Sequence, residues 1–87
     1  MISHRKASSL QRLTAELSRA IACCRIAKLQ ESIAEKLSYL IVAERTSAKF
    51  IKLHLQGKIP QSQSIMELMV RLEEALGGSA DSFLRQD

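Results

Sequence analysis

The stretch LQRLTAELSRAIACCRIAKLQESIAEKLSYLIVAERTSAKFIKLHLQ, residues 10–56, covers about half of the chain and contains neither glycine nor proline. Such a stretch forms either one long helix or several helices joined by tight turns. At about 100° per residue, its apolar residues fall on two stripes that lie roughly 170° apart around the axis. The first stripe comprises Leu10, Leu13, Leu17, Ala20 and Cys24, and the second comprises Leu29, Ile33, Leu37 and Leu40. A turn near residues 26–30 would bring both stripes into one core, so we expect a break there.

The composition favours a small helical domain. The 87 residues are 46% hydrophobic but only 3% aromatic, so the core must be built from Leu, Ile, Ala and Met. These residues favour helices, whereas strands prefer β-branched and aromatic side chains. We therefore predict an all-α single small bundle of four to five helices. At this length one core is close to the lower limit of size, and oligomerisation often adds stability.

Local signals divide the chain into elements. Residues 1–7 are expected to form a flexible basic arm, residues 8–56 two or three helices, residues 62–76 a helix and residues 79–85 a short helical turn. Ser32 followed by Glu35 has the capping-box pattern that starts a helix. Thr46 and Ser47 offer a second break, because hydroxyls favour helix caps over helix interiors. The sequence leaves open whether residues 27–47 bend once or twice.

The helix ends are marked by glycine and proline. Gly57 is expected to follow the last residue of one helix, and Pro60 prevents its continuation. A second capping box, Ser64 with Glu67, then opens a strongly amphipathic helix, which Gly77-Gly78 is expected to close.

Positive charge is concentrated in the first two-thirds of the chain. Residues 1–58 carry 11 Lys and Arg against 4 acidic residues, whereas residues 59–87 carry 2 against 5. Arg45, Lys49, Lys52 and Gln56 follow helical spacing and are predicted to share one face. This asymmetry suggests an anionic partner for the first part of the chain. The alternative is a solvated, lysine-rich helix face with no partner.

Residue patterns of catalytic or metal sites are missing from the sequence. His4 and His54 are far apart, and the adjacent pair Cys23-Cys24 has no second pair at a metal-binding spacing. On a helix the two cysteines point about 100° apart, so we expect reduced, buried thiols rather than a disulfide. We predict no enzyme activity, no cofactor and no metal. The start of the chain lacks an apolar targeting segment and its apolar runs are short, which favours a cytoplasmic location.

Three local patterns resemble the helix-turn-helix family of Cro/CI-type phage repressors and plasmid antitoxins. Residues 29–37, LQESIAEKL, resemble the second helix of that family. Ser47 followed ten residues later by Gly57 resembles the recognition helix and its closing glycine. Residues 72–77, LEEALG, with Phe83-Leu84 resemble the fourth helix and the start of the fifth. The segment 38–46 is longer than the tight turn of the family, and His54 stands where the family usually has an apolar residue.

The resemblance implies a DNA-binding protein that uses a basic third helix. Lys49, Lys52 and Gln56 would then approach base edges in the major groove, while Arg45, Ser47 and Lys58 would contact phosphates. Arg5 and Lys6 of the arm would add further contacts. Such proteins usually bind as symmetric dimers, and the apolar segment 37–43 is a candidate dimer surface formed by Leu37, Tyr39, Leu40, Ile41 and Val42.

Two functions therefore remain open at this point. The first is a small DNA-binding transcriptional regulator or antitoxin-like protein, acting on duplex DNA as a homodimer. The second is a non-enzymatic helical protein, such as an adaptor, small chaperone or phage-type inhibitor, that binds a protein partner through an apolar helix face. Salt-sensitive binding to duplex DNA distinguishes the first from the second.

Overall fold

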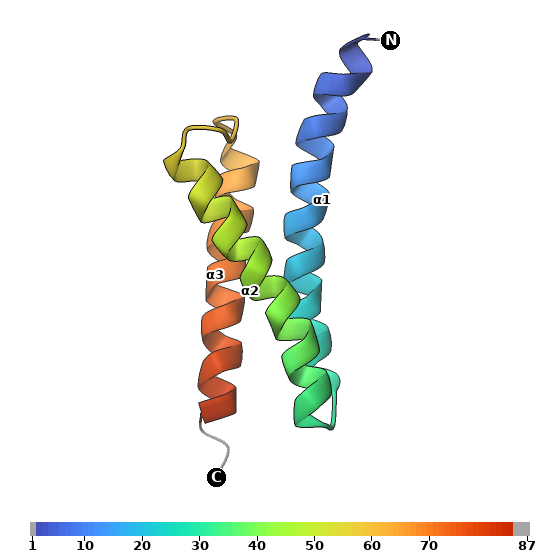
Figure 1. The fold of residues 1–87 in the computed structure, drawn as a ribbon, viewed down its shortest axis with the longest axis vertical. Coiled ribbons are helices and arrows are strands. Elements are labelled where there is room, and N and C mark those ends of the chain that lie inside the picture. The colour runs from blue at the N-terminus through green and yellow to red at the C-terminus, as the bar shows by residue number, and fades with distance from the viewer. Residues whose placement is uncertain (1, 85–87) are drawn as a thin grey trace.

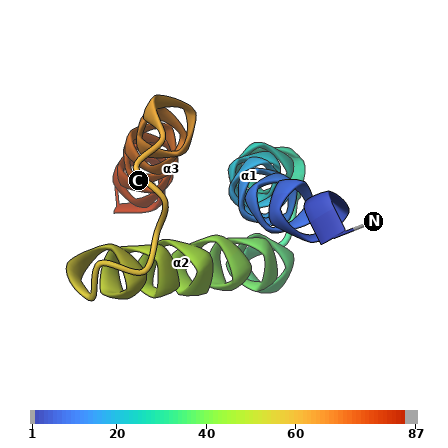
Figure 2. The ribbon, with the colours of Figure 1, turned by 90° about the horizontal axis from the view of Figure 1, so that it is seen from above.

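In the computed structural model, residues 2–84 are described and form three α-helices, α1 (Ile2–Leu29), α2 (Ile33–Leu55) and α3 (Gln63–Leu84). Side chains are described for residues 9–77. Helix α1 runs in one direction, α2 returns beside it, and α3 follows behind α2 (Figure 1). Seen from above, α2 forms one layer that crosses both α1 and α3 (Figure 2). The prediction of an all-α bundle is confirmed for the described residues, with three helices in place of four to five.

The predicted break between the first two helices is present. Helix α1 ends at Leu29, where the Gln30 N–H donates to the Ala27 carbonyl at 3.1 Å. Ser32 caps α2: its hydroxyl oxygen accepts the Glu35 N–H at 3.1 Å and lies 3.1 Å from the Glu35 carboxylate.

The expectation that both apolar stripes enter one core is wrong for the second stripe. Leu17, Ala20 and Cys24 of the first stripe are buried in the core, but of the second stripe only Leu40 packs against it, and the other three residues are exposed: Leu29, Ile33 and Leu37.

A second break at Thr46-Ser47, which the sequence left open, does not occur, and the separate basic third helix that the resemblance implies is not formed there. Helix α2 continues from Ile33 to Leu55. The Thr46 hydroxyl donates to the Val42 carbonyl one turn earlier, at 3.0 Å. This bond satisfies the buried hydroxyl inside the helix, so Thr46 does not need to act as a cap. Residues 45–55 are the second half of α2.

Helix α2 ends just before Gly57, as predicted. The Lys58 N–H donates to the Leu53 carbonyl at 2.9 Å, and the Gly57 N–H donates to the His54 carbonyl at 3.0 Å. This is the Schellman arrangement, which requires a left-handed residue at Gly57, and Gly57 has φ 69°. The chain then turns through Pro60 into α3.

Helix α3 is longer than predicted at its C-terminal end. It begins at Gln63, where the Met66 N–H donates to the Ser62 carbonyl at 3.0 Å, so Ser64 lies inside the first turn and is not the cap. It continues through Gly77-Gly78 to Leu84 and replaces the predicted short turn at 79–85, of which residue 85 lies outside the described residues. Glycine weakens a helix interior by only about 1 kcal/mol, which packing elsewhere on the helix can offset.

The N-terminal segment also differs from the prediction. Residues 2–7 belong to α1, not to a flexible arm. The positions of the Arg5 and Lys6 side chains lie outside the described part of the chain.

The core lies where the three helices meet. Its buried residues come from all three helices and from the connection before α3, and they are Leu17, Ala20, Cys24, Ala43, Phe50, Ile59, Ile65, Met69 and Leu72. Among residues 9–77, Phe50 is the largest fully buried side chain. Because Phe50 fixes one side of α2 toward the core, the opposite side faces solvent.

Candidate nucleic-acid interface

The predicted basic face of α2 lies on the outer side of the bundle. Arg45, Lys49, Lys52 and Gln56 are exposed, and Lys58 is exposed in the turn that follows. Phe50 and Thr46, which point to the other side of α2, are buried. The spacing of the cations thus reflects the amphipathic pattern of a helix whose inner side packs into the core.

One of these lysines is held against the neighbouring helix. The Lys49 Nζ lies 2.7 Å from Oε2 of Glu16 on α1, and the two side chains are 52% and 33% exposed. The same ammonium lies 6.0 Å from the centre of the Phe50 ring. Ion pairs at this exposure contribute at most about 1 kcal/mol. The pair therefore adds little stability, but it shows that the side of α1 with Glu16 lies beside the side of α2 with Lys49.

Two arginines of α1 lie beside this ion pair. Arg12 and Arg19 are exposed and stand four residues before and three residues after Glu16, so the three side chains share one side of α1. Since α1 and α2 run in opposite directions, Arg12 lies toward the Lys52 end and Arg19 toward the Arg45 end (Figure 1). Glu16 thus lies between two arginines on its own helix and pairs with Lys49 of α2.

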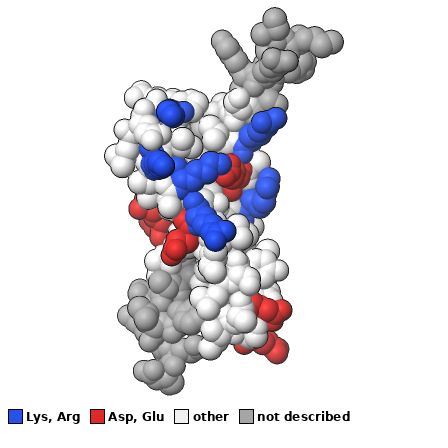
Figure 3. Space-filling view, viewed as in Figure 1, with Lys and Arg blue, Asp and Glu red and all other residues white. Residues whose placement is uncertain are grey.

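Together these residues form what we call the basic surface: Arg12, Arg19, Arg45, Lys49, Lys52 and Lys58, with Glu16 among them. Figure 3 shows Lys and Arg side chains gathered over the face made by α1 and the second half of α2, with acidic side chains among them, at their left border and at the lower right of that view. Helical spacing predicted the α2 members. The contribution of Arg12 and Arg19 could not be predicted, because it depends on which side of α1 packs beside α2.

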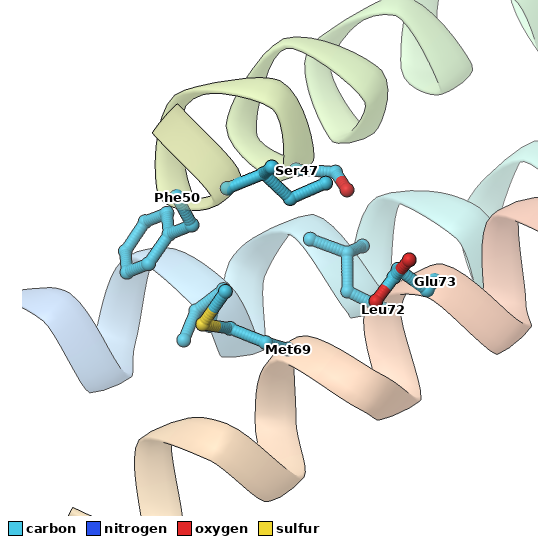
Figure 4. Close-up of a pocket in the computed structure, with 7 residues that line it drawn as sticks. Ser47, Phe50, Met69, Leu72 and Glu73 are labelled. Atoms are coloured by element: carbon cyan, nitrogen blue, oxygen red, sulfur yellow. The ribbon is translucent and has the colours of Figure 1, made fainter. Parts of the chain in front are cut away.

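Ser47, predicted to contact phosphates, lies on another side of α2. It is half-buried and lines a narrow seam between α2 and α3 with Phe50, Met69, Leu72 and Glu73 (Figure 4). The seam has no room for a water molecule. Ser47 is therefore not part of the basic surface.

The predicted dimer residues are divided between surface and core. Leu37, Ile41 and Val42 are exposed, whereas Tyr39 and Leu40 are half-buried, and Leu40 packs against the core. The apolar residues of segment 37–43 therefore lie on two different sides of α2. One side contacts α1, and the other faces solvent.

The two cysteines are free thiols, and the predicted burial holds for Cys24, whereas Cys23 is half-buried. Cys24 is buried, and burial raises the pKa of its thiol above the ordinary value of 9.0. The neighbouring Cys23 raises the pKa of Cys24 further, and the positive charge of Lys28 opposes both effects. Burial and the neighbouring Cys23 both favour the protonated thiol, so Cys24 is protonated and unreactive at neutral pH.

Among the described residues, no group of three or more His, Cys, Asp or Glu side chains could hold a metal ion. Within that same part of the chain, none of the helices has the length and hydrophobicity needed to cross a membrane.

Comparison with known proteins gives no relative. No family model, no curated protein and no solved structure matches this chain. The function must therefore be argued from the residues of the basic surface.

Proposed function

We propose that this protein is a small DNA-binding regulator that contacts the phosphates of duplex DNA through the basic surface. The observation that supports the proposal is that six exposed cationic side chains come from adjoining parts of α1, α2 and the following turn, where Lys49 of α2 pairs with Glu16 of α1. Duplex DNA carries one negative charge per about 1.7 Å of its axis, so a surface with several adjacent cations matches it. Arginine and lysine are also the residues that proteins use most for phosphate contacts.

Phosphate contacts suit this surface better than base reading by a separate recognition helix. The second half of α2 lies beside α1, and Lys49 is already paired with Glu16 on that helix. A recognition helix must enter the major groove with its side chains free to reach base edges. Gln56 at the C-terminal end of α2 is the remaining neutral side chain on this face that could read a base. We therefore expect weak dependence on DNA sequence.

The proposal is tested by fluorescence anisotropy with a random-sequence duplex at increasing salt. The wild-type protein should bind at low salt, with log K falling by about 0.9 per log salt for each phosphate neutralised. The double variant Lys49→Ala/Lys52→Ala should bind more weakly, with a salt slope smaller by about 0.9 to 1.8, the lower value applying if Lys49 stays paired with Glu16. Undetectable binding of the wild type at low salt would contradict the proposal.

A charge-matched control separates this surface from general positive charge. Lys28→Ala/Arg71→Ala also removes two exposed cations, one near the end of α1 and one on α3, both outside the basic surface. It should leave the salt slope nearly unchanged. Glu16→Gln should act in the opposite direction and strengthen binding, because it removes the carboxylate that pairs with Lys49. Equal losses in the two double variants would assign the binding to net charge.

The partner-binding alternative gains support if DNA binding is undetectable. The described residues include several exposed large apolar side chains on α2, among them Leu37, Ile41 and Leu55. An apolar helix face of this kind is a common binding surface for another helix.

A further inference from the structure

The cations of the basic surface stand in two rows, one on each of two helices that run in opposite directions. Arg12 and Arg19 of α1 are seven residues apart, and Arg45 and Lys52 of α2 have the same spacing. Seven residues span about 10.5 Å and return the side chain to nearly the same side of a helix. Lys58, in the turn that follows, extends the second row. We call these sets the α1 row (Arg12 and Arg19) and the α2 row (Arg45, Lys52 and Lys58).

An ion pair stands between the two rows. Glu16 lies between the two arginines of the α1 row, Lys49 lies between the first two cations of the α2 row, and their side chains meet at 2.7 Å. The charge of Lys49 is thus balanced inside the surface, and the five cations of the two rows supply its excess positive charge. Leu17 and Phe50, which follow the paired residues in sequence, are fully buried in the same core. The packing of α1 on α2 therefore holds the two rows at a fixed separation.

Two rows of cations match the two backbones of a duplex. The backbones of B-DNA are about 6 Å apart across the minor groove and about 12 Å apart across the major groove. The axes of packed helices are about 8–10 Å apart, a value between these two widths. Long Arg and Lys side chains make up the difference, so each row can contact one strand. A single strand offers one line of phosphates and would have to fold back on itself to meet both rows.

The surface also lacks aromatic rings on which the bases of a single strand could stack. The aromatic residues within 9–77 are Tyr39 and Phe50. Phe50 is fully buried, and Tyr39 is half-buried in the first half of α2, six residues before the α2 row begins. Proteins that bind single strands without sequence preference combine a basic groove with such rings. The basic surface has the cations of that arrangement without the rings, which favours a duplex as its ligand.

We infer that the two rows contact the two strands of one duplex, the α1 row one strand and the α2 row the other. The inference rests on the proposed binding to duplex DNA, and it adds how the surface distinguishes a duplex from a single strand. On a natural duplex all five cations contribute, for a salt slope of about 4.5 at about 0.9 per phosphate. Where one strand carries no charge, the α2 row contributes alone.

The test compares two probes by fluorescence anisotropy at increasing salt. One is a natural random-sequence duplex, and the other is the same duplex with methylphosphonates that make one strand uncharged, which we call the half-neutral duplex. The half-neutral duplex has the charge spacing of a single strand, so each contact contributes about 0.7 to the slope. Contact of the two rows with different strands should lower the slope from about 4.5 to about 2.1, three contacts at about 0.7. A slope near 3.5, five contacts at about 0.7, would overturn the inference.

Removing the α1 row gives a second readout. Arg12→Ala/Arg19→Ala should lower the slope on the natural duplex by about 1.8. The same variant should leave the slope on the half-neutral duplex nearly unchanged, because the α2 row already binds the charged strand. The matched control Lys28→Ala/Arg71→Ala removes two exposed cations outside both rows and should leave both slopes nearly unchanged. Circular dichroism checks that each variant is folded. Comparable losses in Arg12→Ala/Arg19→Ala on both probes would place both rows on one strand and refute the inference.

Failure of this inference and failure of the proposed function give different results. A five-contact slope on the half-neutral duplex leaves phosphate binding by the basic surface intact and removes only the contact with two strands. Undetectable binding of the wild type to the natural duplex at low salt removes the proposed function, and the contact with two strands together with it.

Discussion

Replacing Leu72 with alanine tests the packing of the three helices. Leu72 is 1% exposed and lines the seam between α2 and α3, where Leu17 of α1 also lies. The substitution removes three carbon groups, worth about 2.4 kcal/mol at about 0.8 kcal/mol each. Because elements from three directions surround the site, we expect it to collapse only partly. The cavity then adds to the loss, for a total of about 2.5–5 kcal/mol.

The measurement is urea unfolding followed by far-ultraviolet circular dichroism. A chain of this length has a total stability of about 4–13 kcal/mol, so Leu72→Ala could unfold a large fraction of the protein. Leu72→Met keeps the volume and should lose less than about 1.5 kcal/mol, which preserves a measurable transition. Val70→Ala is the control on the same helix, since Val70 is 52% exposed, and it should be nearly neutral. A loss below about 1 kcal/mol for Leu72→Ala would refute the three-helix core.

Three further predictions concern caps, glycines and a thiol. Ser32→Ala should lower the free energy of unfolding by about 1 kcal/mol because Ser32 caps α2. Ser47→Ala should not lower it, because Ser47 lies inside α2. Equal losses in the two variants would indicate that Ser47 also caps a helix. Gly57→Ala should destabilise the folded protein because Gly57 has φ 69°. Gly77→Ala should stabilise it by up to about 1 kcal/mol, because alanine favours a helix interior and its Cβ would meet no atom within 4 Å. Thermal melts in which Gly77→Ala is less stable than Gly57→Ala would show that α3 ends before Gly77. The raised pKa of Cys24 stabilises the folded state below pH 9.0, and this contribution is lost as the pH rises through the higher folded-state pKa. The stability advantage of wild type over Cys24→Ala should therefore shrink above pH 9.0 in urea titrations, and a constant difference would contradict the burial of this thiol.

The break between α1 and α2 was predicted from the two apolar stripes and from the Ser32 cap, and the end of α2 from Gly57. Ser32 with Glu35 supplies a cap, and Gly57 supplies a left-handed residue, so each signal acts through bonds within a few residues. Thr46 and Ser47 left open whether α2 is one helix or two, because a hydroxyl can either cap a helix or bond to the preceding turn. In this protein Thr46 is buried and bonds to Val42, and burial depends on contacts made by the rest of the chain.

The extension of α3 through Gly77 and the start of α1 at Ile2 were also missed. Glycine and polar residues lower helix propensity by amounts that a long neighbouring helix can outweigh, so their effect cannot be judged from position alone.

The sequence by itself determined that this protein is helical, that Arg45, Lys49 and Lys52 share one side of a helix, and that Cys24 points into a core. Each of these follows from the period of a helix and the preference of apolar side chains for burial. Only the tertiary structure decided that Arg12 and Arg19 join the basic surface, that Ser47 leaves it, and that an apolar stripe on α2 stays exposed. These features depend on which sides of the helices meet, and the period of one helix carries no information about its neighbours.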